Sequence, residues 1–287
     1  MQDVTKSKQA AVVELFGKPT DQPANWAGIV AGQQCPFTSQ RCYKIRKSDP
    51  TTSIGTCVVR FGRGETPLII CPKRFLANKG QVFTDCLHLL TTHEPGNELH
   101  IIPEVSIPGG SVDYFLVSAR DGKPTDFVGI EFQGLDTTGT IWPHRQEFLM
   151  KMGVIDKAEA RKSFGVNWKM TAKTILVQLH HKIETFEVVN RKLVLILQQE
   201  LLEYMAREFS FGHLENARLG DSMQFHPYRL EETIAGHKMA LGTRMSTDIV
   251  GISKALNLGQ SGNVAIEDIL RQLAAKMNNG TLWSPVS

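Results

Sequence analysis

Two acidic side chains and one amide lie on two apolar runs near the middle of the chain. Asp113 is near the start of the run VDYFLVSA, while Glu131 and Gln133 lie in the run DFVGIEFQ. Residues two apart in a strand point to the same face, so Glu131 and Gln133 project together, and a simple hairpin register brings Asp113 close to Glu131. Two such carboxylates predict a Mg²⁺ site able to activate water against a phosphodiester. The alternative is that they are solvent-facing residues of a half-exposed sheet.

Cysteines form a second group. Four of the five fall within 37 residues: Cys35, Cys42, Cys57 and Cys71. Four thiolates in a tetrahedral arrangement bind zinc or a single iron, and such a site would order a loop-rich segment that cannot bury its own core. The spacing is not a CxxC…CxxC pattern, so four unrelated buried cysteines are the alternative. Cys86 is interpreted as an ordinary buried residue.

Basic side chains gather around these cysteines. Residues 35–79 hold nine basic and two acidic residues, a net charge of +7, so the rest of the chain carries −4 of the total of +3. A positive field of this kind suits binding to a phosphate backbone, and arginine can also bind guanine. A solvated basic face is the alternative. The candidate DNA-binding residues are Arg41, Lys44, Arg46, Lys47, Arg60, Arg63, Lys73 and Arg74.

Composition excludes several classes of protein. The chain has 287 residues, of which 41% are apolar and 21% charged, in the range of globular proteins, which excludes disordered, collagen-like and coiled-coil chains. No apolar run reaches the length of a membrane helix, and the first residues lack the apolar core of a signal peptide. We therefore expect no membrane partner and a cytoplasmic, reducing compartment in which the cysteines are not disulfides.

The elements that must position these side chains follow from periodicity. Between residues 98 and 134 the period is two, and the runs are separated by Gly109-Gly110 and by Asp121-Gly122, which predicts an antiparallel meander of three strands. A helix over residues 170–189 with the buried stripe Ile175, Leu179, Ile183 and Phe186 is expected next, then a buried strand over 192–197 and a helix over 199–209.

Other segments carry weaker signals. Helices are predicted over residues 6–16, 81–90 and 265–277, short strands over 56–61 and 67–70, and a loop at residues 142–145 that could touch DNA. The predicted organisation is an N-terminal helix and linker at residues 1–34, a metal-binding, DNA-contacting module at 35–79, and a catalytic core with a helical C-terminal part at 80–287. The fold class is mixed α/β, with a mixed central sheet flanked by helices.

The order of these elements resembles the core of PD-(D/E)xK nucleases. In that superfamily an Asp near the start of one strand is followed, after a hairpin, by Glu-x-Lys on the next. Here the positions are Asp113, Glu131 and Gln133, with Gln in place of the usual Lys and Val112 in place of Pro. A neutral amide can position water but cannot lower its pKa as an ammonium would. The resemblance also implies an additional acidic candidate upstream, Glu104, whose local geometry Pro103 affects.

The four cysteines together with Glu-x-Gln resemble the NotI-type type II restriction endonucleases. The resemblance implies iron ligands at Cys35, Cys42, Cys57 and Cys71, catalytic residues at Asp113, Glu131 and Gln133, and a bacterial homodimer that cuts a GC-rich palindrome in double-stranded DNA. The implied cofactors are catalytic Mg²⁺ and iron, with zinc the alternative because both metals accept tetrahedral thiolates.

Two other functions compete with an endonuclease. A non-catalytic DNA-binding regulator would bind DNA without Mg²⁺-dependent cleavage. A rubredoxin-like redox module on an unrelated domain would show an iron chromophore whose reduction is coupled to activity.

Overall fold

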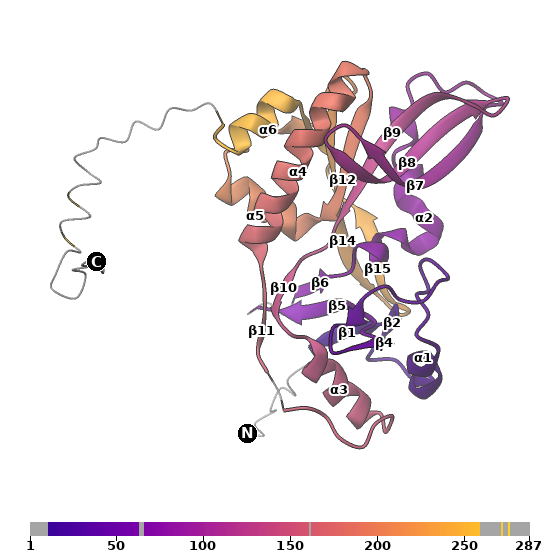
Figure 1. Ribbon diagram of the computed structural model, residues 1–287, viewed down its shortest axis with the longest axis vertical. Helices are drawn as coiled ribbons and strands as arrows, with labels where there is room; N and C mark the ends of the chain where they lie inside the picture. The colour runs from indigo at the N-terminus through magenta and orange to yellow at the C-terminus, as the bar shows by residue number, and fades with distance from the viewer. Residues whose placement is uncertain (1–10, 63–65, 161, 259–270, 272–274, 276–287) are drawn as a thin grey trace, which may run out of the picture.

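The computed structural model describes residues 11–62, 66–160, 162–258, 271 and 275. Figure 1 shows a larger part, built on a central sheet and carrying most of the helices, and a smaller part that holds the first strands and helix α3. The predicted mixed α/β class with a mixed central sheet is confirmed.

The predicted meander forms one side of the central sheet. Its strands are β7 (Glu98–Ile107), β8 (Gly110–Arg120) and β9 (Lys123–Gln133), and both pairings are antiparallel. Asp121 and Gly122 make the second turn with φ values of +52° and +71°, the left-handed conformation that Asp-Gly hairpin turns adopt. The meander prediction is confirmed along its whole length.

The sheet continues through a fully buried strand. Strand β12 (Lys192–Gln198) runs parallel to β9 on one side and to β14 (Met223–Thr233) on the other. The central sheet has eight strands: seven follow the order β13-β16-β14-β12-β9-β8-β7, and the eighth, β15, pairs with β14. The remaining strands of this sheet are β13 (Glu215–Asn216), β15 (Gly236–Leu241) and β16 (Met245–Thr247).

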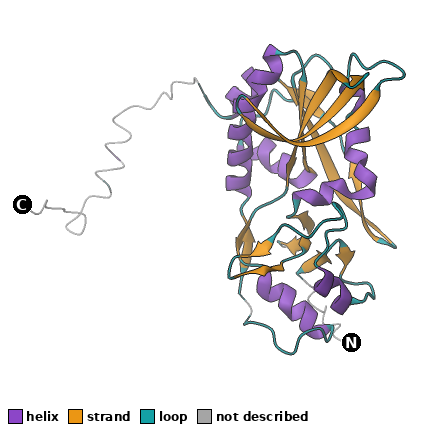
Figure 2. Cartoon of the chain, turned by 45° about the vertical axis from the view of Figure 1, so that its right-hand side comes forward, coloured by secondary structure: helices purple, strands orange, loops and turns teal. Residues whose placement is uncertain are grey.

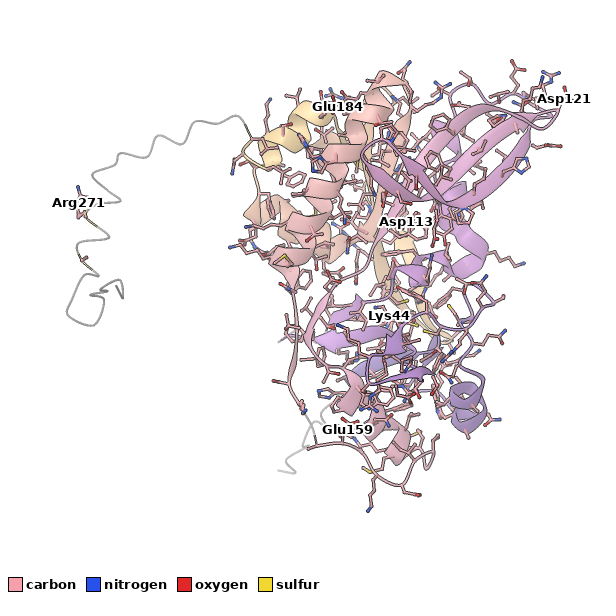
Figure 3. The ribbon with its side chains drawn as sticks, viewed as in Figure 1. Lys44, Asp113, Asp121, Glu159, Glu184 and Arg271 are labelled. Atoms are coloured by element: carbon pink, nitrogen blue, oxygen red, sulfur yellow. The ribbon has the colours of Figure 1, made fainter. Side chains whose placement is uncertain are left out.

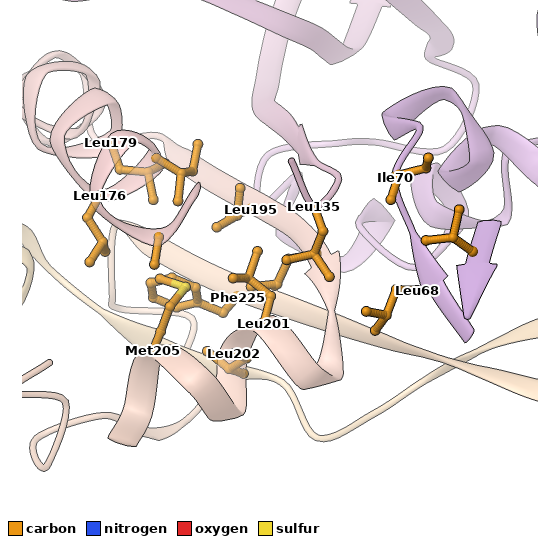
Figure 4. Close-up of a cluster of buried hydrophobic side chains, with 14 of the residues drawn as sticks. Leu68, Ile70, Leu135, Leu176, Leu179, Leu195, Leu201, Leu202, Met205 and Phe225 are labelled. Carbon is orange, nitrogen blue, oxygen red and sulfur yellow. The ribbon is translucent and has the colours of Figure 1, made fainter. Parts of the chain in front are cut away.

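Helices cover both faces of this sheet, as Figure 2 shows. Leu193, Leu195 and Leu197 of β12 belong to one apolar cluster, whereas Val194 and Ile196 belong to the other, because successive strand residues point to opposite faces. Helices α4 (Trp168–Val188), α5 (Gln199–Glu208) and α6 (Ile249–Ala255) supply the first cluster, part of which Figure 4 draws. The 3₁₀ helix η1 (Pro72–Leu76) and helix α2 (Ala77–Thr84) supply the second.

The smaller part is built on a second sheet with the order β2-β1-β5-β6. These strands are β1 (Val12–Leu15), β2 (Lys18–Pro19), β5 (Thr56–Phe61) and β6 (Thr66–Ile69). The other elements here are α1 (Trp26–Gly32), β3 (Ile45–Arg46), β4 (Asp49–Ser53), β10 (Thr137–Gly139), α3 (Trp142–Lys151) and β11 (Phe164–Val166).

The helix predicted over residues 6–16 is wrong where the structure describes it. Residues Val12–Leu15 form strand β1, and all four are buried, so both faces of this segment are covered and no solvent-exposed helical face exists. Two β-branched valines and pairing with β2 and β5 favour the strand.

Three other predicted segments differ from the structure or lie outside its described residues. The loop expected at residues 142–145 is the first turn of α3, since Pro143 fits a helix N-terminus, and Trp142 and Arg145 are buried rather than free to touch DNA. The helix predicted over 81–90 is split between α2 and the 3₁₀ helix η2 (Leu87–Leu89). The helix predicted over 265–277 lies outside the described residues, apart from two isolated positions.

Other helical predictions agree with the structure. Helix α4, strand β12 and helix α5 lie within one or two residues of their predicted bounds. Among the described residues, none of the helices has both the length and the apolar character needed to span a membrane.

Hydrogen bonds join the two parts at the carboxyl ends of β9 and β12. The Gln198 amide donates to the Pro67 carbonyl at 2.7 Å, and its oxygen accepts the N–H of Ile69 at 2.7 Å. Just past β9, the N–H of Leu135 donates to the Ile69 carbonyl at 2.8 Å. These bonds hold β6 against the end of the central sheet that bears Glu131.

Candidate active site

Strands β8 and β9 bring the two predicted carboxylates together. Tyr114 and Ile130 are the last pair of the antiparallel β8–β9 ladder, and Asp113 and Glu131 are the residues directly beyond them on the two strands. The N–H of Phe132 donates to Oδ2 of Asp113 at 2.8 Å, which fixes the Asp113 carboxylate against β9. The predicted proximity of Asp113 and Glu131 therefore appears in the folded chain.

Glu131 is a buried carboxylate, 5% exposed. Burial raises its pKa to about 7; a hydrogen bond from Lys182 acts to lower the pKa, and the negative charge of Asp113 acts to raise it. A strongly shifted acid beside a second acid is typical of functional sites. The half-exposed-sheet alternative does not describe Glu131, because helix α4 covers this face.

Lys182 of α4 is a site residue that the sequence analysis missed. Its Nζ lies 2.6 Å from Oε1 of Glu131, and both side chains are buried. The predicted stripe on α4 included Leu179, Ile183 and Phe186, and position 182 falls on the same helical face by its spacing from Leu179 and Phe186. A lysine on the apolar side of a predicted helix was the signal available for it.

Glu104 and Gln133 occupy different surroundings. Glu104 is exposed and lies between the pairs Pro103–Tyr114 and Val105–Val112, so it faces Asp113 across the β7–β8 ladder. Its φ of +52° is rare for a residue other than glycine within a strand. Gln133 ends β9, and its amide donates to the Gly134 carbonyl at 2.6 Å.

A cleft of about 670 Å³ opens between the two parts of the chain at Asp113. Figure 3 shows Asp113 near the junction of the two parts, with Lys44 in the part below it. The sheet contributes acidic and aromatic groups to the cleft, and the segment around the cysteines contributes polar and aromatic ones. Its lining residues are Phe37, Thr38, Gln40, Tyr43, Pro72, Lys73, Leu76, Pro103, Glu104, Asp113, Tyr114 and Phe132.

Lys73 supplies positive charge to this cleft. Its Nζ donates to the Tyr114 hydroxyl at 2.9 Å. Partial burial acts to lower the pKa of Lys73, but the Tyr114 hydroxyl, Asp113 and Glu104 outweigh it, so the pKa is raised. A protonated lysine beside Asp113 and Glu104 can bind a phosphate group of a nucleic acid.

The four clustered cysteines are all buried free thiols: Cys35, Cys42, Cys57 and Cys71. A hydrogen bond from Cys57 lowers the pKa of Cys71 to about 6, with Lys44 lowering it further against the effect of burial. Burial raises the pKa of Cys42, and the charges of Cys71 and Cys35 add to that rise. These thiols are therefore close enough to interact electrostatically, and their donor type suits a soft metal.

No preformed metal site is visible in the part of the chain that the structure describes. Within those residues, no three His, Cys, Asp or Glu side chains are placed so that they could hold an ion as they stand. The donor chemistry of the cysteines and of the Asp113–Glu131 pair fits a thiolate-bound metal and Mg²⁺ respectively.

The eight candidate DNA-binding residues differ in their exposure to solvent. Arg41 and Lys47 are exposed, and Lys44, Arg46, Arg60 and Lys73 are half-buried. Arg74 is instead 4% exposed, its guanidinium bonded to both carboxylate oxygens of Glu14 and to the His237 carbonyl. Arg74 thus ties β1 to η1, while Arg63 lies outside the described residues.

Comparison with known proteins identifies the family. A search of curated proteins finds no match. The family model described as restriction endonuclease NotI matches residues 29–241, about three quarters of the chain, including every cysteine of the cluster and the carboxylate pair. The chain therefore belongs to the NotI restriction endonuclease family, and is a type II restriction endonuclease, a site-specific deoxyribonuclease that binds DNA.

Proposed function

We propose that this endonuclease hydrolyses phosphodiester bonds of double-stranded DNA with Mg²⁺ at Asp113 and Glu131, within a PD-(D/E)xK-type core. The observation that carries the proposal is the proximity of buried Glu131 to Asp113, which lines the cleft; burial, with the negative charge of Asp113 added, raises the pKa of Glu131 to about 7. A divalent cation relieves that repulsion, so the pair favours metal binding.

The residues have separate roles in the proposed reaction. Asp113 and Glu131 hold the metal, which when bound would supply the positive charge that activates water and stabilises the charge on phosphorus. The Gln133 amide orients the attacking water, exchanging its bond to the Gly134 carbonyl for one to that water. Glu104, which faces Asp113 across the β7–β8 ladder, contributes a further carboxylate in a supporting role. As the water oxygen bonds to phosphorus, the bond to the leaving oxygen breaks and the proton passes to solvent.

We also propose that Cys35, Cys42, Cys57 and Cys71 hold one iron or zinc ion. Four buried thiols, one with a pKa lowered to about 6, support a soft-metal site. The ion would draw the thiols into a tetrahedron and stabilise residues 35–79 as a DNA-contacting module between residues 1–34 and the catalytic core of residues 80–287.

DNA would enter the cleft between this module and the sheet. The proposed contacts come from the basic candidates of residues 35–79 other than Arg74: Arg41, Lys44, Arg46, Lys47, Arg60, Arg63 and Lys73. We leave Arg74 out of the set because Glu14 neutralises it inside the protein. A GC-rich palindrome read by a homodimer in the bacterial cytoplasm completes the proposal, since two-fold DNA symmetry calls for two-fold protein symmetry.

One experiment tests the reaction and its specificity together. The purified protein is incubated with a large natural DNA and Mg²⁺, and fragment ends are mapped. We expect discrete fragments that share one GC-rich palindromic end sequence, and no cleavage when EDTA replaces Mg²⁺. Cleavage that persists in EDTA would contradict the metal assignment, and ends from a non-palindromic site would contradict the homodimer. Sedimentation measurements give the oligomeric state independently.

A further inference from the structure

Lys182 forms the one ion pair with Glu131 that we find in the described residues. The Nζ–Oε1 distance is 2.6 Å, and the side chains are 8% and 6% exposed. The two residues are 51 positions apart, on helix α4 and strand β9. Lysine is rarely buried unless it is paired, and burying such a pair seldom increases stability compared with apolar residues. Its position therefore calls for an explanation beyond packing.

The β7–β8 turn is shaped to accommodate this lysine. A Cβ added to Gly110 would lie 3.2 Å from Cε of Lys182, and one added to Gly109 would lie 2.0 Å from the His181 carbonyl. Thr185 of α4 also donates to the Pro108 carbonyl at 2.8 Å. The turn between the strands that bear Glu104 and Asp113 therefore packs directly on the helix around Lys182 and confines its side chain.

Strand β9 has a neutral residue, Gln133, at the position where PD-(D/E)xK nucleases usually have a lysine. Gln133 is neutral and its amide faces the Gly134 carbonyl. Lys73, the other nearby lysine, donates to the Tyr114 hydroxyl on the cleft side, and among the described residues we find no ion pair between Lys73 and Glu131. The positive charge next to Glu131 comes from helix α4.

We propose that Lys182 is a positioning residue of the active site, whose ammonium orients the Glu131 carboxylate for metal binding and supplies from a helix the charge that Gln133 does not. This inference rests on the proposed function, because it assumes that Glu131 binds the metal. Lys182 acts through Glu131 and contacts no reacting atom. A fixed cation and its carboxylate keep the site organised before DNA arrives.

The test compares Lys182→Met, Lys182→Arg and Lys169→Met, in which Lys169 is an exposed lysine on the same helix. Mn²⁺ binding without DNA, followed by electron paramagnetic resonance, gives a readout separate from activity. Cleavage rate and KM, DNA affinity without metal, and thermal unfolding are measured alongside it.

We expect Lys182→Met to bind Mn²⁺ at least about 10-fold more weakly and to cleave about 100-fold more slowly at saturating DNA and metal, with DNA affinity within about 3-fold. Lys182→Arg keeps the positive charge, so its Mn²⁺ affinity should stay within about 10-fold of the unaltered protein. Removing a residue that orients a metal ligand typically lowers metal affinity by roughly 10- to 100-fold. Lys169→Met should match the unaltered protein in every measurement.

A merely structural lysine would give the opposite pattern. Lys182→Met would then unfold at a lower temperature but keep its Mn²⁺ affinity and cleavage rate, and that result overturns the proposal. If Lys182→Met does not fold, Lys182→Arg decides: near-normal Mn²⁺ binding supports the proposal, and its loss in a folded protein overturns it. The variant Asp113→Asn distinguishes a failure of the role proposed for Lys182 from a failure of the proposed active site. Should it too retain cleavage, the proposed site itself is wrong; should it alone abolish cleavage, only the role of Lys182 fails.

Discussion

The backbone N–H of Phe132 donates a hydrogen bond to the Asp113 carboxylate at 2.8 Å, which ties the acid of β8 to the strand that bears Glu131. One Asp113 oxygen is thus used to hold the two strands in register.

Asp113→Asn should abolish cleavage while leaving the fold intact. Asparagine keeps an acceptor for the Phe132 N–H but loses the charge that a metal needs, so we expect the cleavage rate to fall by at least about 100-fold. DNA affinity measured in EDTA should change little. Asp121→Asn is the matched control, because Asp121 lies at the exposed turn far along the hairpin and Asn tolerates its φ of +52°. Equal cleavage by both variants would exclude Asp113 from the site.

The cysteine cluster makes a prediction about metal content. Cys71→Ser should leave the purified protein with little iron or zinc, measured per chain by mass spectrometry of the digested protein, and should lower its unfolding temperature. Cys86→Ser is the control, since Cys86 is buried near His226, with 3.7 Å between Sγ and Nδ1, on the central sheet side. Unchanged metal content in Cys71→Ser would show that the four thiols are separate buried residues.

The raised pKa of Glu131 predicts that stability and metal affinity change in opposite directions as the pH rises. In the metal-free protein the pKa of Glu131 is about 7, whereas the ordinary value for glutamate is 4.5. Between these pH values the folded protein therefore holds the Glu131 proton more tightly than the unfolded protein does. The contribution of Glu131 to the free energy of unfolding therefore decreases as pH rises from about 4.5 to 7. Metal binding requires the charged form, so Mn²⁺ affinity should increase over the upper part of that range.

Titrations of Mn²⁺ at several pH values between 6 and 8 check this prediction. The charged groups around Glu131 are Asp113 and Lys182, and the variant Glu131→Gln retains both. It should bind Mn²⁺ weakly at every pH. A pH dependence that persists in Glu131→Gln would assign the titration to another group.

The buried pair Glu14–Arg74 predicts a large effect on stability. Glu14→Gln leaves Arg74 buried without its counter-charge, so we expect the free energy of unfolding to drop by about 3 to 5 kcal/mol in urea denaturation. The double variant Glu14→Gln with Arg74→Met should recover much of this loss, because neither residue is then charged. Removing Glu94, paired with Arg120 on the surface, should cost less than about 1 kcal/mol. A small effect at Glu14 would mean that Arg74 remains accessible to solvent, and would restore it as a DNA-contact candidate.

The sequence by itself determined the local architecture of the site. The period of two, interrupted at Asp121-Gly122, is a property of neighbouring residues, and it predicted the meander and the shared region of Asp113 and Glu131. The apolar run of β12 and the stripe on α4 were predicted for the same reason. Cysteine spacing indicated which thiols share a segment.

Tertiary structure alone decided which charged groups face the interior. Lys182 contacts Glu131 across 51 residues, and Arg74 contacts Glu14 across 60, so no local pattern specified either partner. Likewise, residues 12–15 become a strand because β5 lies beside them, a pairing that outweighs their helix-like spacing. Burial and long-range pairing depend on how separate elements pack, and it is this packing that makes a lysine on helix α4 a neighbour of the Glu131 carboxylate.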